Sequence, residues 1–259
     1  MASTLRCTPS WARTGPRRIP ALPPAPAPAA RQPSPWQSTC SQSTHAHAPP
    51  PPPPGTATEP LSPSCKPIRP LSQQQRDFLS SALRVNQTGE LAAILIYAAQ
   101  HPVIVRAHPH LRPLMKHMYD QEAGHYTYFN RVLSKHRIRP TAMYPVWYAA
   151  ASFLGWSTAV LGREAAMACT EAVETEIGTH YNEQLRVLLD WANRSEARGE
   201  RLGPELDKLV VDLRRIRDEE LDHLDHAVEH DAKQAKPYEL LTEVIRAGCR
   251  GAIWVSERL

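Results

Sequence analysis

Two short segments place a glutamate and a histidine three residues apart within otherwise apolar helical patterns. Glu122 and His125 fall in the run YDQEAGHYTYF, and Glu220 and His223 fall in the run RDEELDHLDH. Apolar residues recur at helical spacing on both sides of each pair, which predicts that both pairs lie on buried helix faces. The residues that define these faces are Leu111, Met115, Met118, Phe129 and Val132 for the first pair, and Leu206, Leu209, Leu213, Ile216 and Ala227 for the second.

Buried carboxylates and imidazoles cost several kcal/mol each unless they are neutralised, paired or bound to a metal. Two further glutamates, Glu90 and Glu174, also stand among apolar residues, so the order along the chain is Glu, ExxH, Glu, ExxH. A four-helix bundle that directs these groups inward has the ligand set of carboxylate-bridged di-iron proteins. Four carboxylates would balance the charge of two ferrous ions, so the sequence predicts an all-α bundle with a buried metal site.

Other acids lie close to these positions. Asp120 and Asp218 come two residues before the motif glutamates, and helical geometry directs them away from the buried face, toward solvent or outside partners. Glu171 lies one turn before Glu174 and is the alternative ligand on the third helix.

The first 68 residues differ in composition from the rest of the chain. Of the 26 prolines, 19 precede residue 71, and Glu59 is the only acidic residue before Asp77. We expect residues 1–68 to be a disordered, proline-rich segment and residues 69–259 to form one domain. The run MASTLRCTPSWARTGPRRIP is rich in Arg, Ser and Thr and lacks acids, which is typical of a mitochondrial or chloroplast transit peptide rather than a secretory signal.

Net charge and cysteine content indicate which partners and which cellular compartment fit the chain. Most of the charge in the N-terminal segment is basic, so without that segment the expected domain is close to neutral, and a nucleic-acid partner is not supported. The domain contains only Cys169 and Cys249, which indicates no disulfide framework and fits a reducing compartment.

Apolar periodicity and prolines predict the positions of the main helices. The first should end at His101-Pro102, and Arg139-Pro140 should close the second. The others are expected at about 163–192, 205–231 and 237–259.

The longest uncharged run covers residues 140–162. Its length suits a membrane span, but Pro145 and Gly155 interrupt it. We expect a short helix plus the start of the next one, either buried in the protein or lying against a membrane surface.

Five segments together resemble the demethoxyubiquinone hydroxylase family of ubiquinone biosynthesis, a family of ferritin-like di-iron proteins. They are LRVNQTGELAA, YDQEAGHYTYFN, GREAAMACTEAVETEIGTHYNEQLR, RDEELDHLDHAVEHDA and AGCRGAIWVSERL. The resemblance covers about residues 72–259. It implies that the metal ligands are Glu90, Glu122, His125, Glu174, Glu220 and His223. The residues before the first glutamate, usually an aspartate, a histidine and a small residue, are Asn86, Gln87 and Thr88 here.

The resemblance also implies an activity. It is that of a mitochondrial monooxygenase on the matrix face of the inner membrane, which uses two irons and O2 to hydroxylate the ring of a polyprenylated methoxy-methyl-benzoquinone. Glu122 and Glu220, from the two ExxH helices, are the expected bridging ligands. A lipid-binding accessory protein would present the quinone.

The electron source is not encoded in a recognisable motif. No glycine-rich nucleotide loop follows a strand pattern, so a Rossmann site for NADH is not predicted. The resemblance implies that NADH supplies the electrons and that the residues matching His180 and Tyr181 assist their transfer.

Three other functions use the same ligands. A ferritin-like iron store would not need the apolar run at 140–162, and a di-iron quinol oxidase would reduce O2 to water without hydroxylating its substrate. The third is a metal-stabilised helical interaction module without turnover.

Overall fold

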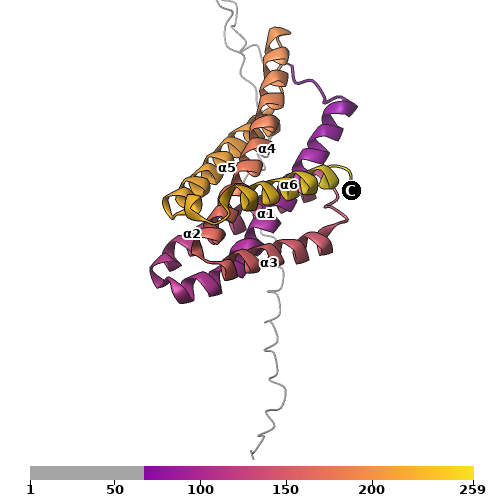
Figure 1. Cartoon of the computed structure of the whole chain (residues 1–259). Helices are drawn as coiled ribbons and strands as arrows, with labels where there is room; N and C mark the ends of the chain where they lie inside the picture. The colour runs from indigo at the N-terminus through magenta and orange to yellow at the C-terminus, as the bar shows by residue number, and fades with distance from the viewer. Residues whose placement is uncertain (1–66) are drawn as a thin grey trace, which may run out of the picture. The chain divides into compact units, whose positions relative to one another are not determined.

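The structure, a computed structural model, describes residues 67–259, and six α-helices form most of this part of the chain (Figure 1). Its only β pairing is an isolated bridge between Ile68 and Arg201. The expected all-α class is therefore confirmed, whereas the transit segment expected within residues 1–68 lies almost wholly outside the described residues. The helices are α1 (Gln73–Ala107), α2 (Arg112–His136), α3 (Tyr144–Leu161), α4 (Arg163–Ala197), α5 (Pro204–Glu229) and α6 (Tyr238–Ser256), with single 3-10 turns η1 (Pro109–Leu111) and η2 (Ala232–Gln234).

Four of these helices carry the sequence motifs and form the bundle. Helix α1 packs against α2, and α4 packs against α5, so each pair forms a helical hairpin. The two additional helices, α3 and α6, both pack against α1 and α4, and Figure 1 shows α6 crossing the bundle. The architecture is a four-helix bundle with additional helices, as the sequence predicts.

Helix α1 is longer than the sequence predicts. It begins at a capping box, in which the Ser72 hydroxyl accepts a hydrogen bond from the Gln75 backbone N–H and the Gln75 side chain accepts one from the Ser72 N–H. It does not end at Pro102 but continues through it to Ala107. Ile104 and Val105 are buried beyond the proline, and their burial offsets the hydrogen bond that the proline cannot donate.

The uncharged run forms one helix, α3, rather than a short helix and the start of the next. Gly162 separates it from α4 and has a φ of 123°, a conformation that residues with a Cβ rarely adopt. Gly155 permits close packing, since a Cβ there would lie 2.7 Å from the Ile96 Cα on α1 and nearer still to the Ile96 carbonyl oxygen. Helix α3 is therefore seated directly on the backbone of α1.

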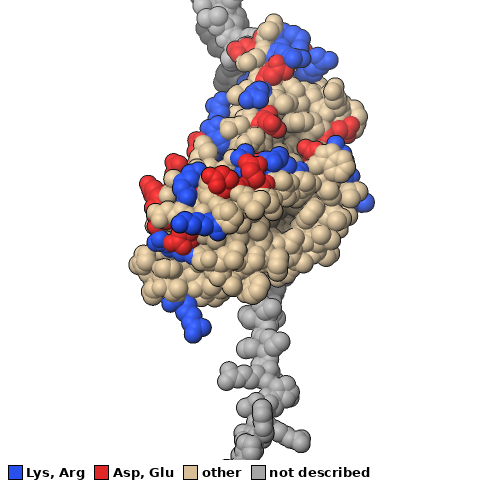
Figure 2. Space-filling view, in the orientation of Figure 1, with Lys and Arg blue, Asp and Glu red and all other residues tan. Residues whose placement is uncertain are grey.

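The outer face of α3 is apolar and exposed. Figure 2 shows few charged side chains over this helix, in contrast to the surface over α4, α5 and α6. Among the described helices, only α1 is long and apolar enough to span a membrane, and half of that stretch is buried inside the protein. The apolar character of α1 is thus explained by its place as a core helix of the bundle. The exposed large apolar residues of α3 are Tyr144, Val146, Tyr148, Phe153, Trp156, Val160 and Leu161.

Candidate metal centre

All six side chains that the sequence suggests as metal ligands lie together in the interior of the bundle. Each is at most 3% exposed. Their ligand atoms form two groups, and within each group all of the atoms lie within 4.8 Å of one another. Glu122 and Glu220 belong to both groups. The first group is Glu90, Glu122, His125 and Glu220, and the second is Glu122, Glu174, Glu220 and His223.

The atoms that face the middle of the cluster lack hydrogen-bond partners. Both carboxylate oxygens of Glu122 and of Glu220 are buried without a partner, and so is one oxygen each of Glu90 and Glu174. The Nδ1 atoms of His125 and His223 also face this space, 3.1 Å from an oxygen of Glu220 and 2.9 Å from an oxygen of Glu122 respectively, without forming a well-oriented hydrogen bond. Buried polar atoms are otherwise almost always satisfied, so a cluster of eight such atoms fits bound metal ions. The buried glutamates and histidines could hold metal ions.

The outward nitrogens of the two histidines have partners on the opposite motif helix. The Nε2 atom of His125 on α2 lies 2.5 Å from a carboxylate oxygen of Glu219 on α5. The Nε2 atom of His223 on α5 lies 3.0 Å from the amide oxygen of Gln121 on α2. Because these oxygens accept a hydrogen bond, each Nε2 donates its proton outward and leaves the Nδ1 lone pair free to bind a metal.

Sequence reasoning did not identify Gln121 or Glu219. A signal was present, since each residue immediately precedes a motif glutamate and has a side chain that accepts hydrogen bonds. Each of them lies one turn before the histidine of its own helix, but it contacts the histidine of the opposite helix, and the sequence does not show that α2 and α5 face each other.

Two tyrosines hold the two lone glutamates. Tyr97 on α1 donates a 2.7 Å hydrogen bond to Glu174 on α4. In the reverse direction, Tyr181 on α4 donates to Glu90 on α1. Each glutamate therefore has one oxygen fixed by a phenol and the other directed into the cluster.

The pKa shifts of the clustered residues show that this buried site is unfavourable for ionised side chains without a compensating charge. Burial and the nearby negative charge of Glu220 raise the pKa of Glu90, Glu122 and Glu174. Burial also opposes ionisation of Glu220, but the adjacent imidazoles of His125 and His223 lower its pKa to about 2. Burial disfavours the charged form of His125, yet the adjacent carboxylates of Glu220 and Glu90 outweigh that effect and raise its pKa to about 11. Cations bound in the centre would replace the protons that balance this charge.

The acids considered as alternatives lie outside the cluster. Glu171 bonds to Lys233 and accepts a 2.8 Å hydrogen bond from Tyr238, so its carboxylate ties α4 to α6. Asp120 pairs with Lys116, and Asp218 pairs with Arg217 at the surface.

The residues before Glu90 that depart from the family pattern contact other side chains. Asn86 and Gln184 exchange two amide hydrogen bonds. Gln87 donates to Asn130 at 3.1 Å, and Thr88 donates to the Arg84 carbonyl at 2.8 Å.

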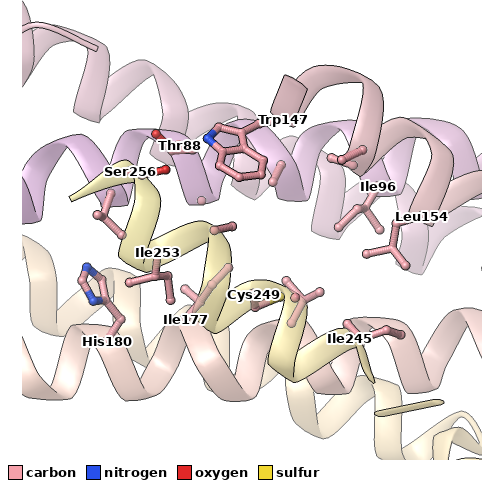
Figure 3. A pocket seen from close by; sticks show the side chains of 18 of the residues that line it. Thr88, Ile96, Trp147, Leu154, Ile177, His180, Ile245, Cys249, Ile253 and Ser256 are labelled. Atoms are coloured by element: carbon pink, nitrogen blue, oxygen red, sulfur yellow. The ribbon is translucent and has the colours of Figure 1, made fainter. Parts of the chain in front are cut away.

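An apolar cavity of about 370 Å³ lies beside the cluster, between α1, α3, α4 and α6 (Figure 3). Tyr181 lines it and also bonds to Glu90, so one side chain joins the cavity to the cluster. His180 lines the cavity as well, and its ring bonds to the backbone of Ala82. Three polar atoms of the lining lack hydrogen-bond partners, namely Trp147 Nε1, His180 Nε2 and Ser256 Oγ.

A bundle with one glutamate from each of two helices and a Glu-x-x-His pair from each of the other two is the arrangement of the ferritin-like carboxylate metal proteins. Comparison with known proteins defines the family more narrowly. The family model described as "Ubiquinone biosynthesis protein COQ7" matches residues 77–256, and the chain belongs to this family. The family expected from the sequence is thereby confirmed.

Relatives from distant organisms match most of the described part of the chain. The 5-demethoxyubiquinone hydroxylase, mitochondrial, of Saccharomyces cerevisiae is 47% identical over 73% of this chain and 82% of its own length. The human protein named NADPH-dependent 3-demethoxyubiquinone 3-hydroxylase, mitochondrial, is 40% identical over 73% of this chain and 82% of its own. The 3-demethoxyubiquinol 3-hydroxylase of Rhodospirillum rubrum is 38% identical over 68% and 76% respectively.

Proposed function

We propose that this chain is a di-iron monooxygenase that hydroxylates the ring of a demethoxyubiquinone. Its relatives are named for this reaction, and they match more than two thirds of the chain. The observation that carries the proposal is the apolar cavity that reaches Tyr181, one hydrogen bond away from the buried cluster. An iron store would need the cluster but not the cavity.

We assign the six clustered side chains to two iron ions. Glu90 and His125 would hold one ion, and Glu174 and His223 the other, while Glu122 and Glu220 would bridge them because they belong to both groups. Iron held there would supply the activation of O2, a reaction that protein side chains alone do not perform.

The residues of the chain provide the remaining conditions for hydroxylation. Burial of the six ligands excludes water from the reacting region. Tyr97 and Tyr181 orient the two lone glutamates, and the opposite motif helices orient the histidines. The ligand atoms are thus held in place before any substrate enters.

The cavity suits a quinone ring with an apolar tail. Its lining is almost entirely apolar, whereas the unpartnered atoms of Trp147, His180 and Ser256 offer hydrogen bonds. In Figure 3, Trp147 and Ser256 lie at the same end of the cavity, away from the apolar Ile245 and Leu154. The indole N–H and the serine hydroxyl would donate to ring oxygens, and the isoprenoid tail would follow the apolar end.

Burial lowers the pKa of His180 to about 4, so its imidazole is neutral at pH 7. A neutral imidazole bonded to the Ala82 backbone has one free nitrogen, Nε2, which would accept a hydrogen bond from a hydroxyl of the substrate ring when that ring is in its reduced, quinol form.

We further propose that a nicotinamide nucleotide supplies the electrons and that His180 and Tyr181 assist their transfer to the ring. The sequence analysis expects NADH, and the human relative is named NADPH-dependent. Both nucleotides therefore belong in the assay.

The proposed location is the mitochondrion, on the matrix face of the inner membrane. The eukaryotic relatives are named mitochondrial. The exposed apolar side chains of α3, and Leu240, Val244 and Trp254 on α6, belong to helices that also line the cavity. These side chains would face the lipid or a lipid-binding accessory protein.

The decisive assay uses purified protein loaded anaerobically with ferrous iron and given NADH or NADPH, a short-chain demethoxyquinone and ¹⁸O-labelled O2. A hydroxylated product carrying the label supports the proposal. O2 uptake without a hydroxylated product would instead define a quinol oxidase. No O2 uptake with either nucleotide would leave iron binding or a structural role and contradict the hydroxylase.

A further inference from the structure

The two histidines of the cluster have different outer partners, although the rest of the site is nearly symmetric. Each of the two metal positions has one lone glutamate held by a tyrosine and one motif histidine. His125 donates to the carboxylate of Glu219, whereas His223 donates to the neutral amide of Gln121. The site is therefore symmetric in its ligands and asymmetric in the charge behind them.

The contact between His125 and Glu219 is close and well oriented. The two atoms are 2.5 Å apart, compared with 3.0 Å between His223 and Gln121. Arg215, one turn earlier on α5, bonds both Glu219 oxygens at 2.9 and 2.8 Å. The guanidinium fixes the carboxylate in one orientation, so the carboxylate can hold the imidazole in turn.

A carboxylate behind a metal-bound imidazole makes its other nitrogen a stronger ligand than an amide does. The negative charge stabilises the positive charge that the ring takes up from the metal, and a neutral amide does so less. Loss of such an outer partner costs roughly 10- to 100-fold in metal affinity.

We infer that the two metal positions are unequal, and that Glu219 makes the position of Glu90 and His125 the one that binds a divalent cation more tightly. Glu219 is a positioning residue, because it acts through His125 and does not itself lie in the cluster. The inference rests on the proposed metal centre but not on the proposed reaction with a quinone.

Cobalt(II) is a suitable probe, because its visible absorption reports coordination and its binding heat gives affinities without any turnover. We expect the full-length chain to bind two Co(II) ions with dissociation constants that differ by about tenfold or more. Glu219→Gln should weaken the tighter ion about tenfold and bring the two constants together, since both histidines would then donate to an amide. Gln121→Glu is the reciprocal variant and should tighten the weaker ion.

Asp218→Asn is the matched control. It removes the same charge from the neighbouring residue of α5, but Asp218 is exposed and pairs with Arg217. Its Co(II) constants should equal those of the unchanged protein. Assignment of the positions comes from Glu174→Ala, which should retain the tighter ion, and Glu90→Ala, which should retain the weaker one.

Two equal constants in the unchanged protein would overturn the inference while leaving the metal centre intact. An equal effect of Glu219→Gln and Asp218→Asn would also overturn it, since the contact with His125 would then not matter. Failure of the unchanged protein to bind Co(II) at all would refute the metal centre and this inference together. Melting of the metal-free variants separates the effect from misfolding, and Gln121→Glu keeps the test open if Glu219→Gln is unstable.

Discussion

The phenol of Tyr97 on α1 donates a 2.7 Å hydrogen bond to Glu174 on α4, and Tyr181 on α4 donates one back to Glu90 on α1. The two bundle helices thereby each supply a glutamate and the tyrosine that holds the other's glutamate. This exchange fixes the register of α1 against α4. It also links the cluster to the cavity, because Tyr181 lines both.

Removing the hydroxyl of either Tyr97 or Tyr181 should destabilise the metal-free protein. Tyr97→Phe and Tyr181→Phe each leave one buried carboxyl oxygen without its partner, which costs about 1–3 kcal/mol. Urea unfolding of the metal-free proteins measures the loss. Tyr97 does not line the cavity, so Tyr97→Phe should leave quinone binding unchanged. A change in quinone affinity in Tyr97→Phe would contradict the placement of Tyr97 outside the cavity.

Trp147→Phe should weaken binding of a short-chain demethoxyquinone about fivefold, the effect of losing one hydrogen bond of about 1 kcal/mol. The change removes the unpartnered indole N–H from the cavity and keeps most of the apolar contact. Trp156→Phe is the control, because Trp156 lies on the same helix, is 52% exposed and does not line the cavity. Equilibrium dialysis with metal-free protein reports affinity independently of turnover. Equal affinities in both variants would show that the indole N–H does not contact the ring.

The stability of the protein should fall below about pH 6.5 partly through His180. Burial lowers its pKa from 6.5 in the unfolded chain to about 4 in the folded protein, so between these values the unfolded state binds more protons. Stability therefore rises with pH across this window, and His180 contributes up to about 3 kcal/mol that is lost as pH falls toward 4. His180→Leu should flatten this part of the profile relative to the unchanged protein. Parallel unfolding profiles from pH 4 to pH 7 would refute the assignment.

Gly155→Ala should separate α3 from α1. The added Cβ would lie 2.7 Å from the Ile96 Cα and nearer still to the Ile96 carbonyl oxygen, both of them main-chain atoms that cannot rotate away. Overpacking of this kind costs about 1–3 kcal/mol. Gly124→Ala is the control, because a Cβ at that position would have no neighbouring atom within 4 Å and alanine favours the helix. Thermal melting should show a lower midpoint for the first variant and an unchanged or higher one for the second.

The apolar periodicity of the sequence predicts the bundle. The six clustered residues could be identified as candidate ligands because polar side chains interrupt that periodicity at Glu122, His125, Glu220 and His223. Such interruptions are informative only when burial is costly, as it is for ionisable groups. The predicted end of α1 is wrong, since tertiary burial of Ile104 carries the helix past Pro102.

The sequence alone could not predict the hydrogen-bond partners of the cluster residues or the cavity. Tyr97 looks like another apolar-face residue until α4 is placed beside it, and Glu219 looks like a surface acid until α2 is placed opposite α5. The cavity combines residues of α1, α3, α4 and α6 that have no common motif. Contacts between distant helices are set by packing, and packing is not periodic along the chain.

The most direct test of the metal centre is the iron content of the purified protein and two variants after anaerobic loading with ferrous iron. The unchanged chain should hold two irons, Glu171→Ala should also hold two because Glu171 bonds to Lys233 and Tyr238, and Glu174→Ala should hold one. Two irons in Glu174→Ala would show that another acid serves as the ligand. No bound iron in the unchanged protein under any loading condition would contradict the di-iron centre and the oxygenase that depends on it.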